Sequence, residues 1–139
     1  LLLLAECQIE TGELGPALDN INAIRNRAAN ADGFVKEDDG TTNAANYVIA
    51  PYPAFANAEE ARDALYMERK LELGMEGHRF FDLVRWGIAE TEINRILDYE
   101  GPLRSLLYNS DVSFGSEDVK YPIPQRQIDL SNGNLTQNR

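Results

Sequence analysis

Three glutamates, Glu68, Glu72 and Glu76, stand four residues apart in the segment ERKLELGMEGHRFFDLVRWG. On a helix this spacing places them along one face, where carboxylates could serve as the acid and the base of glycoside hydrolysis. Glycosidases, however, hold their two carboxylates on opposite sides of the sugar, about 5 Å or about 6.5–9.5 Å apart. Three carboxylates on one helical ridge do not flank a substrate. We therefore predict no catalytic residues and no enzyme, and a glycosidase that uses Glu68 and Glu72 is the least favoured alternative.

The same segment provides basic partners for its acids. Opposite charges recur in it three residues apart, as in Asp82 and Arg85. Such pairs stabilise a helix surface by a few tenths of a kcal/mol each, and a buried pair costs more when one partner is removed. We interpret the segment as structural and expect it to tie its helix to Arg25, Arg27 and the tail. The predicted structural residues are Glu68, Arg69, Glu72, Glu76, Arg79, Asp82, Arg85 and Trp86.

The chain has few residues that are suited to metal binding or to nucleophilic catalysis. His78 is the only histidine and Cys7 the only cysteine of the chain. A di-iron bundle site needs Glu three residues before His, where this chain has Met75, and a zinc site needs further His or Cys ligands. The group Asp38-Asp39-Gly40 begins like a calcium loop, but the alternating acids and the final Glu are missing. We predict no metal and no cofactor.

Aromatic and amide side chains gather between residues 30 and 56, where a long loop is expected. Rigid aromatic faces can stack on sugar rings at little entropic cost, and amides can bond sugar hydroxyls. Phe80, Phe81 and Trp86, which stand among charges on a short helix, are more typical of core anchors. The candidate ligand-binding residues are Tyr47, Tyr52, Phe55, Asn43 and Asn46.

The elements that must position these residues follow from periodicity and from helix breakers. Two helices joined at Thr11-Gly12 form a hairpin that is similar to a tetratricopeptide unit, with Pro16 in the first turn of the second helix. Glycine, proline, asparagine and aspartate then break any helix until Ala56. The predicted organisation is one domain portion with a helical hairpin at 1–29, a loop at 30–56, signature helices at 57–100 and an irregular tail at 101–139.

The signature helices have recognisable ends. Asn57 is a predicted N-cap, with Glu60 three residues later. We expect a break near Gly77, a shorter helix over residues 78–86 that stops at Gly87, and a fourth helix over residues 88–97. Gly101-Pro102 then either ends this helix or starts another turn around residues 103–107. An extended segment is expected over residues 119–124, because a residue that precedes proline avoids the α region. The predicted core stripe of the first of these helices is Ala61, Ala64, Leu65, Leu71 and Met75.

Composition narrows the classes of partner. The chain has 139 residues, 43% of them hydrophobic, which is typical of a globular protein. A net charge of −10 argues against nucleic acid and against binding to anionic lipid. The opening LLLLAEC is too short and lacks the basic start of a signal peptide. Leu1–Leu4 would be apolar around the whole helix, which predicts burial in something larger, so we interpret the chain as a C-terminal fragment.

Three motifs carry a resemblance to a known family. ERKLELGMEGHRFFDLVRWG resembles the C-terminal signature of the SusD/RagB family, YPIPQRQIDLSNGNLTQN resembles its closing motif, and ALDNINAIRNRAA resembles its helical hairpin. Together they span nearly the whole chain in the expected order. Gln127 stands where an acidic residue is usual and Gly133 where proline is common, so only the geometry of the tail departs from the pattern.

The resemblance implies a function and a location. Members of this family are outer-membrane, cell-surface lipoproteins anchored by an N-terminal lipidated cysteine that this chain lacks. They bind oligosaccharides or peptides and pass them to a TonB-dependent, SusC-like transporter without catalysis. In such proteins the signature is a structural hallmark, and variable segments contact the glycan. A helical-repeat scaffold for protein partners is the alternative from another class.

Overall fold

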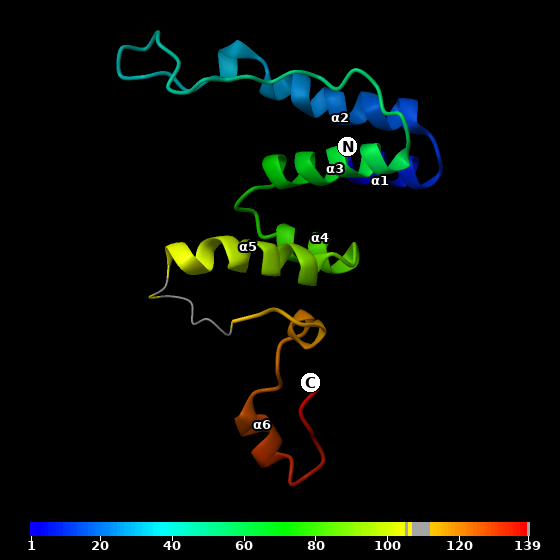
Figure 1. The fold of residues 1–139 in the computed structure, drawn as a ribbon, viewed down its shortest axis with the longest axis vertical. Helices are drawn as coiled ribbons and strands as arrows, with labels where there is room; N and C mark the ends of the chain where they lie inside the picture. Colours follow the sequence, from blue (N-terminus) through cyan, green and yellow to red (C-terminus); the bar gives the residue numbers. More distant parts are fainter. Residues whose placement is uncertain (105, 107–111, 139) are drawn as a thin grey trace. The chain divides into compact units, whose positions relative to one another are not determined.

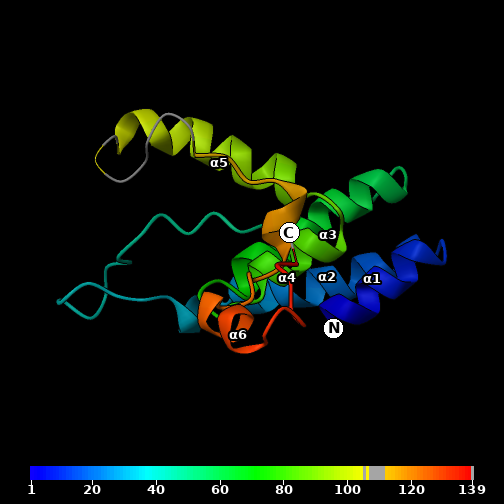
Figure 2. The same cartoon turned by 90° about the horizontal axis from the view of Figure 1, so that it is seen from below.

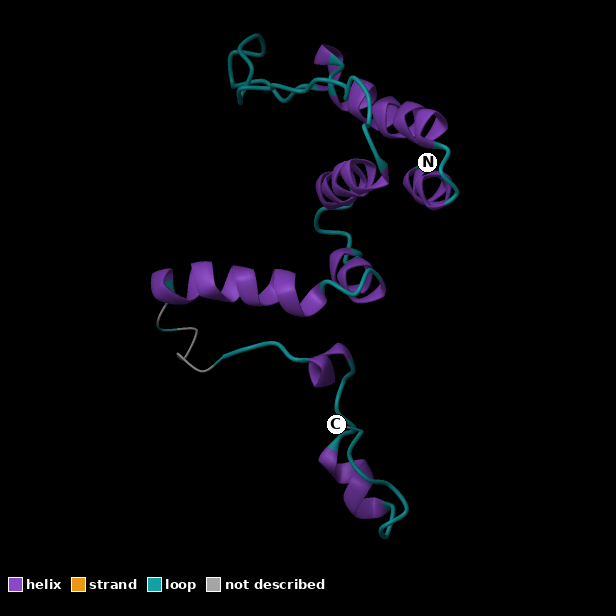
Figure 3. Cartoon of the chain, turned by 45° about the vertical axis from the view of Figure 1, so that its right-hand side comes forward, coloured by secondary structure: helices purple, strands orange, loops and turns teal. Residues whose placement is uncertain are grey.

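Helices dominate the part of the chain that the computed structural model describes, which is residues 1–104, 106 and 112–138. Figure 3 shows helices connected by loops, and the mainly helical fold predicted from the sequence is confirmed. No strand forms among these residues, where Lys36 and Asn43 make an isolated antiparallel bridge. The elements are α1 (Leu2–Glu10), α2 (Leu14–Ala28), η1 (Ala31–Gly33), α3 (Ala58–Glu72), α4 (Arg79–Arg85), α5 (Ala89–Leu103), η2 (Ser116–Val119) and α6 (Gln125–Leu130).

The turn between α1 and α2 depends on one glycine. Gly12 has φ +83°, a left-handed conformation that side chains with a Cβ rarely adopt. Its N–H donates to Ile9 O at 3.1 Å, and the N–H of Glu13 donates to Gln8 O at 2.7 Å. These two bonds form a Schellman motif, which satisfies carbonyl groups at the end of α1. The predicted helical hairpin is present, and its tetratricopeptide-like character stays a prediction.

The chain divides into two compact units, Leu1–Arg79 and Phe80–Arg139. In the first unit α1, α2 and α3 pack against one another, and Figures 1 and 2 agree that α1 and α2 lie side by side. Arg62 on α3 donates to both carboxylate oxygens of Glu10, at 2.6 and 2.8 Å, and so joins α3 to the end of α1. The buried core consists of Leu2, Ala5, Ile9, Ala17, Ile21, Ala61 and Leu65.

The predicted N-cap of α3 is confirmed. Asn57 Oδ1 accepts from the N–H of Glu60 at 2.9 Å, and Glu60 Oε2 accepts in return from the N–H of Ala56 at 2.7 Å. The end of the helix differs from the prediction, because α3 stops at Glu72 and not near Gly77.

This early end changes the predicted core. Leu71 and Met75 are 63% and 105% exposed, so their assignment to the core stripe is wrong. Glycine in a helix interior costs about 1 kcal/mol relative to alanine, and two glycines stand within five residues of the end of α3. The chain leaves the helix before them, and Met75 takes φ +68° in the turn.

The first turn of α1 exposes most of its leucines. Leu2 is buried at 6% exposure, whereas Leu1, Leu3 and Leu4 are 64%, 61% and 53% exposed. Apolar side chains therefore point in all directions around the start of α1, as their order in the sequence predicts. Only the side of the helix that carries Leu2 packs against the core of this unit.

In the second unit, α4 ends as the sequence predicts. Gly87 has φ +72°, and its N–H donates to Val84 O at 3.0 Å. The N–H of Ile88 donates to Leu83 O, also at 3.0 Å, which completes a second Schellman motif. Gly87 is thus confirmed as the C-terminal stop of this helix.

The chain after Gly87 is more helical than expected. Helix α5 continues to Leu103 and includes Pro102, so Gly101-Pro102 does not end it, and the alternative of a further turn around residues 103–107 lies partly outside the described residues. Proline clashes with the backbone N–H and the Cβ of the residue before it, and Gly101 lacks the Cβ, which eases the helical conformation at this point. The tail is also not wholly irregular, because it contains η2 and α6. Of the expected extended segment, Lys120 (φ −123°, ψ 138°) and Pro124 (φ −55°, ψ 131°) have extended backbones, whereas Val119 belongs to η2.

Candidate functional site

The long loop between η1 and α3 is anchored on α2. Figure 1 shows it running beyond the end of α2 and returning alongside that helix to the start of α3. Asn22 Nδ2 donates to Tyr52 O at 2.9 Å, and the N–H of Tyr52 donates to Asn22 Oδ1 at 2.8 Å. Arg25 Nε donates to Ala50 O, and its guanidinium lies 4.6 Å from the centre of the Tyr52 ring. We call residues 49–55 the loop base.

Two of the five predicted ligand residues lie in the loop base. The rings of Tyr52 and Phe55 lie 5.7 Å apart, and both pack against the core of α1, α2 and α3. Burial raises the pKa of the Tyr52 phenol. The structure therefore gives these two side chains packing roles, and their contact with a ligand stays a prediction.

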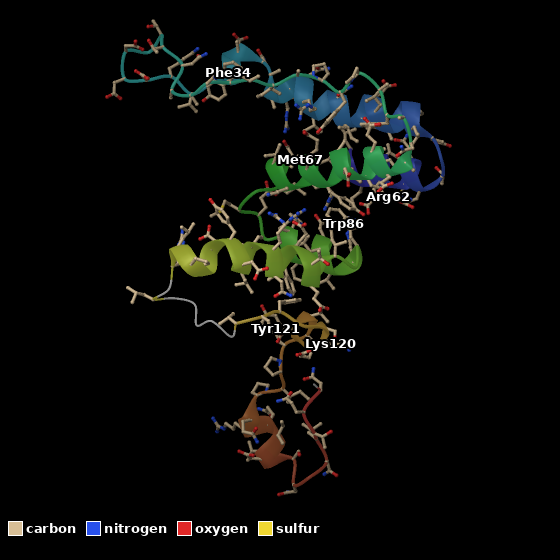
Figure 4. The ribbon with its side chains drawn as sticks, viewed as in Figure 1. Phe34, Arg62, Met67, Trp86, Lys120 and Tyr121 are labelled. Atoms are coloured by element: carbon tan, nitrogen blue, oxygen red, sulfur yellow. The ribbon has the colours of Figure 1, made fainter. Side chains whose placement is uncertain are left out.

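The outer loop, residues 34–48, is built on an aromatic pair. Phe34 and Tyr47 stack with ring centres 4.1 Å apart and planes inclined by 17°. The Tyr47 hydroxyl accepts from the N–H of Val35 at 3.2 Å, which fixes the ring against the opposite leg of the loop. Val35 and Val48, which flank the stack, are 65% and 79% exposed. Figure 4 labels Phe34 on this loop.

The tip of the outer loop is held by polar contacts. Asp39 accepts from the N–H groups of Thr41 and Thr42, both at 2.8 Å, and from the Thr42 hydroxyl at 2.5 Å. The bond from the Thr42 hydroxyl, followed by the backbone bonds, lowers the pKa of Asp39 to about 2. Asn43 accepts from the ammonium group of Lys36, and Asn46 is exposed. The structure thus brings Tyr47, Asn43 and Asn46 into one loop.

Sequence reasoning missed Phe34 as the partner of Tyr47. The two residues stand on either side of Gly40, a spacing compatible with opposite legs of a hairpin. Gly40 has φ +69° in the turn between them. The bridge between Lys36 and Asn43 confirms that the legs face each other.

The signature segment contributes ion pairs within the first unit. Glu68 pairs with Arg25, and these side chains are 5% and 17% exposed. Glu72 pairs with Arg27, and these side chains are more open, at 26% and 65%. The hydrogen bond that Arg27 donates to the Glu72 carboxylate raises the pKa of Arg27. The contacts predicted between the signature and the two hairpin arginines are therefore present.

The second half of the signature has its own contacts. Arg79 Nη1 donates weakly to Tyr66 O at 3.5 Å within the first unit. In the second unit Arg85 donates to the buried carboxylate of Asp82 at 3.0 Å, as predicted from their spacing. The Arg85 guanidinium also lies 4.9 Å from the centre of the Trp86 ring, where a cation–π attraction applies.

The ion pairs of Glu68 and Glu72 argue against a glycosidase that uses these two carboxylates. Glu68 is only 4% exposed and already bonds Arg25, so its carboxylate is not available to protonate a glycosidic oxygen. Glu72 follows on the same helix and pairs with Arg27. Neither carboxylate faces the other across a space for a sugar.

The described ranges contain neither a metal-ligand cluster nor a membrane-spanning helix. His78 Nε2 lies 4.0 Å from Glu76 Oε2 in an exposed turn. Arg69, another residue of the signature, is buried. Within residues 1–104, 106 and 112–138, no three His, Cys, Asp or Glu side chains gather where they could share an ion. The helices described there are all too short or too polar to cross a bilayer.

Comparison with known proteins agrees with the three motifs. Residues 1–139 match the sequence profile of the SusD family. The chain belongs to the SusD family. SusD-like protein P25 of Formosa agariphila is 28% identical to it over 130 residues, which is 94% of this chain and 20% of that protein. The chain thus spans about a fifth of the length of this curated relative. SusD-family proteins are cell-surface binding proteins of the outer membrane, not enzymes.

Proposed function

We propose that the SusD-family protein represented by this chain captures oligosaccharides at the cell surface and delivers them to a TonB-dependent, SusC-like transporter. The observation that carries the proposal is the match to the SusD family over residues 1–139. Proteins of this family bind glycans and work with such transporters. In this proposal no residue of the chain is catalytic, and the full-length protein is held at the outer membrane by an N-terminal lipid.

The outer loop supports a binding role. It combines the aromatic stack of Phe34 and Tyr47 with the amides of Asn43 and Asn46 and the ammonium of Lys36, the kinds of group that hold a sugar. The contacts of Asp39 at the tip and of Asn22 and Arg25 at the base order the loop before any ligand arrives. A preordered loop loses less conformational entropy on binding, which favours affinity.

Binding by the full-length protein tests the proposal. Affinity electrophoresis through gels that contain a starch-like glucan, a host-type glycan or another polysaccharide should retard the protein, and calorimetry with oligosaccharides should give an affinity. Failure to bind any glycan or peptide while another protein is bound would favour the scaffold instead. The variant Glu68→Gln/Glu72→Gln should show no lost hydrolysis, since the proposal includes no turnover.

Delivery requires a second experiment. The protein should co-purify with a SusC-like transporter from outer membranes, and cells that lack it should take up its bound oligosaccharide more slowly. Normal uptake in such cells at limiting oligosaccharide would remove delivery from the proposal and leave binding.

A further inference from the structure

The second unit contains a small pocket that the proposed function has not used. Its volume is about 210 Å³, and it is lined by Phe80, Asp118, Val119 and Tyr121. Phe80 belongs to α4, Asp118 and Val119 belong to η2, and Tyr121, labelled in Figure 4, stands two residues after the end of η2. Segments about forty residues apart in the sequence therefore line one pocket.

The aromatic wall formed by Phe80 is fixed from behind. The Phe114 ring meets Phe80 edge to face, with centres 6.1 Å apart and planes inclined by 80°. Asn94 on α5 bonds both backbone groups of Phe114, donating to its carbonyl at 2.9 Å and accepting from its N–H at 2.8 Å. The position of this wall is thus set without a ligand.

The polar group of the pocket is the carboxylate of Asp118. Its Oδ2 accepts from the N–H of Gly115 at 2.9 Å, a bond that caps η2 and orients the side chain. Each carboxylate oxygen can accept two hydrogen bonds, so Oδ1 remains to accept from a hydroxyl group in the pocket. Phe80 and Val119 contribute apolar surface to the pocket.

Tyr121 adds an open aromatic surface. It is 92% exposed, although tyrosine usually buries much of its ring. An aromatic face beside a carboxylate suits a neutral pyranose, whose C–H face packs on a ring while its hydroxyls donate to an acid. The carboxylate and the net charge of −10 disfavour an anionic ligand. The volume lies below the roughly 300 Å³ at which pockets for drug-sized ligands begin, so the pocket suits a single ring better than an oligosaccharide.

We propose that this pocket is a subsite for one neutral pyranose ring, which stacks on Tyr121 and donates a hydroxyl hydrogen bond to Asp118. The proposal rests on the proposed function, because it assigns one sugar residue of a captured glycan to the second unit. It places this contact on the closing YPIP motif, separately from the outer loop.

Saturation-transfer NMR on the full-length protein tests the subsite. The ligands are methyl glycosides of glucose, galactose and mannose, with methyl glucuronide as the anionic comparison. Irradiation of aromatic protons should transfer saturation to at least one neutral glycoside and not to the glucuronide. Tyr121→Ala should weaken that glycoside about tenfold, whereas Tyr121→Phe, which keeps the ring, should retain its binding. Asp118→Asn should weaken the binding of that glycoside by a similar factor, because an amide NH2 group replaces one of the two acceptor oxygens.

A matched control and a second readout decide the outcome. Tyr99→Ala removes another tyrosine of the same unit, 69% exposed and outside the pocket lining, and should leave glycoside binding unchanged. Absence of transfer to every neutral glycoside, or equal transfer in Tyr121→Ala, would overturn the subsite. Retention of the same variants in polysaccharide gels separates the two proposals. If polysaccharide gels retain the protein but glycoside binding does not depend on Tyr121, the subsite proposal fails and polysaccharide capture stands. If glycoside binding depends on Tyr121 but the gels do not retain the protein, polysaccharide capture fails and the subsite stands.

Discussion

The carboxylate of Glu68 on α3 pairs with the guanidinium of Arg25 on α2, 43 residues earlier in the chain. The same guanidinium bonds Ala50 O and lies over the Tyr52 ring, so one side chain joins two helices and the loop base. Each contact uses a different part of Arg25. Helix packing and loop position are therefore coupled through this residue.

Replacement of Arg25 should be costly because it leaves Glu68 buried without its partner. We expect Arg25→Ala to lower the free energy of unfolding by about 3 kcal/mol, which urea denaturation can measure. Arg27→Ala is the matched control. Its pair with Glu72 is largely exposed, so its loss should cost at most about 1 kcal/mol. Equal losses in the two variants would contradict the assigned importance of burial.

Arg79 should act on stability and not on ligand affinity. Arg79→Ala should lower the Tm and cost about 1–3 kcal/mol, because a half-buried cation loses its hydrogen bonds. The protein that remains folded should bind its oligosaccharide with unchanged affinity by calorimetry. A loss of affinity at an unchanged Tm would show that the signature contacts the ligand.

The loop base should open when Asn22 is shortened. Asn22→Ala removes both side-chain bonds to the Tyr52 backbone and should cost about 1–3 kcal/mol. Hydrogen exchange at the Tyr52 amide and limited proteolysis within residues 34–48 should both accelerate. Asn26→Ala, an exposed change one turn further along α2, should leave both rates as they are. Unchanged exchange in Asn22→Ala would argue that packing alone holds the loop.

The outer loop should contribute to oligosaccharide affinity through Tyr47. Tyr47→Ala removes both the stack with Phe34 and the ring available to a sugar, so calorimetry should show a roughly two- to tenfold loss. Tyr47→Phe keeps the ring and should lose less. Affinity that survives Tyr47→Ala intact would remove the outer loop from the binding site.

The tip of the outer loop should depend on pH through Asp39. Its folded-state pKa of about 2 lies below the ordinary value of 3.8, so its contribution to loop order is complete above about pH 4. As the pH falls through the folded-state pKa, protonation removes the acceptor and the contribution is lost. The amide signals of Thr41 and Thr42 should therefore titrate with a midpoint near 2. A midpoint near 3.8 would show that the three bonds do not persist in solution.

Local signals predicted much of the fold. The N-cap at Asn57, the stop at Gly87 and the pair of Asp82 with Arg85 depend on residues within a few positions of each other, and all three are confirmed. Helix ends that depend on competing costs were less predictable. At the end of α3 the two glycines that follow Glu72 compete with an apolar stripe over Leu71 and Met75, and the structure leaves that stripe exposed.

The candidate ligand residues could not be sorted from the sequence. Tyr47 and Tyr52 stand five residues apart on one loop, yet one stacks in the outer loop and the other packs on the core. The difference arises from Asn22, which is 30 positions away from the backbone it binds. Propensity and spacing carry no information on such a contact.

The two anchored ends of the long loop have a consequence for sequence change. Asn22 and Arg25 hold the loop base on α2, and the bridge between Lys36 and Asn43 closes the outer hairpin. None of these contacts involves the residues between 37 and 42. Insertions or exchanges there add only a small loop-closure entropy. We therefore expect the tip to accept changes in length and sequence while the helices beneath it and the candidate ligand residues Asn43, Asn46 and Tyr47 keep their positions.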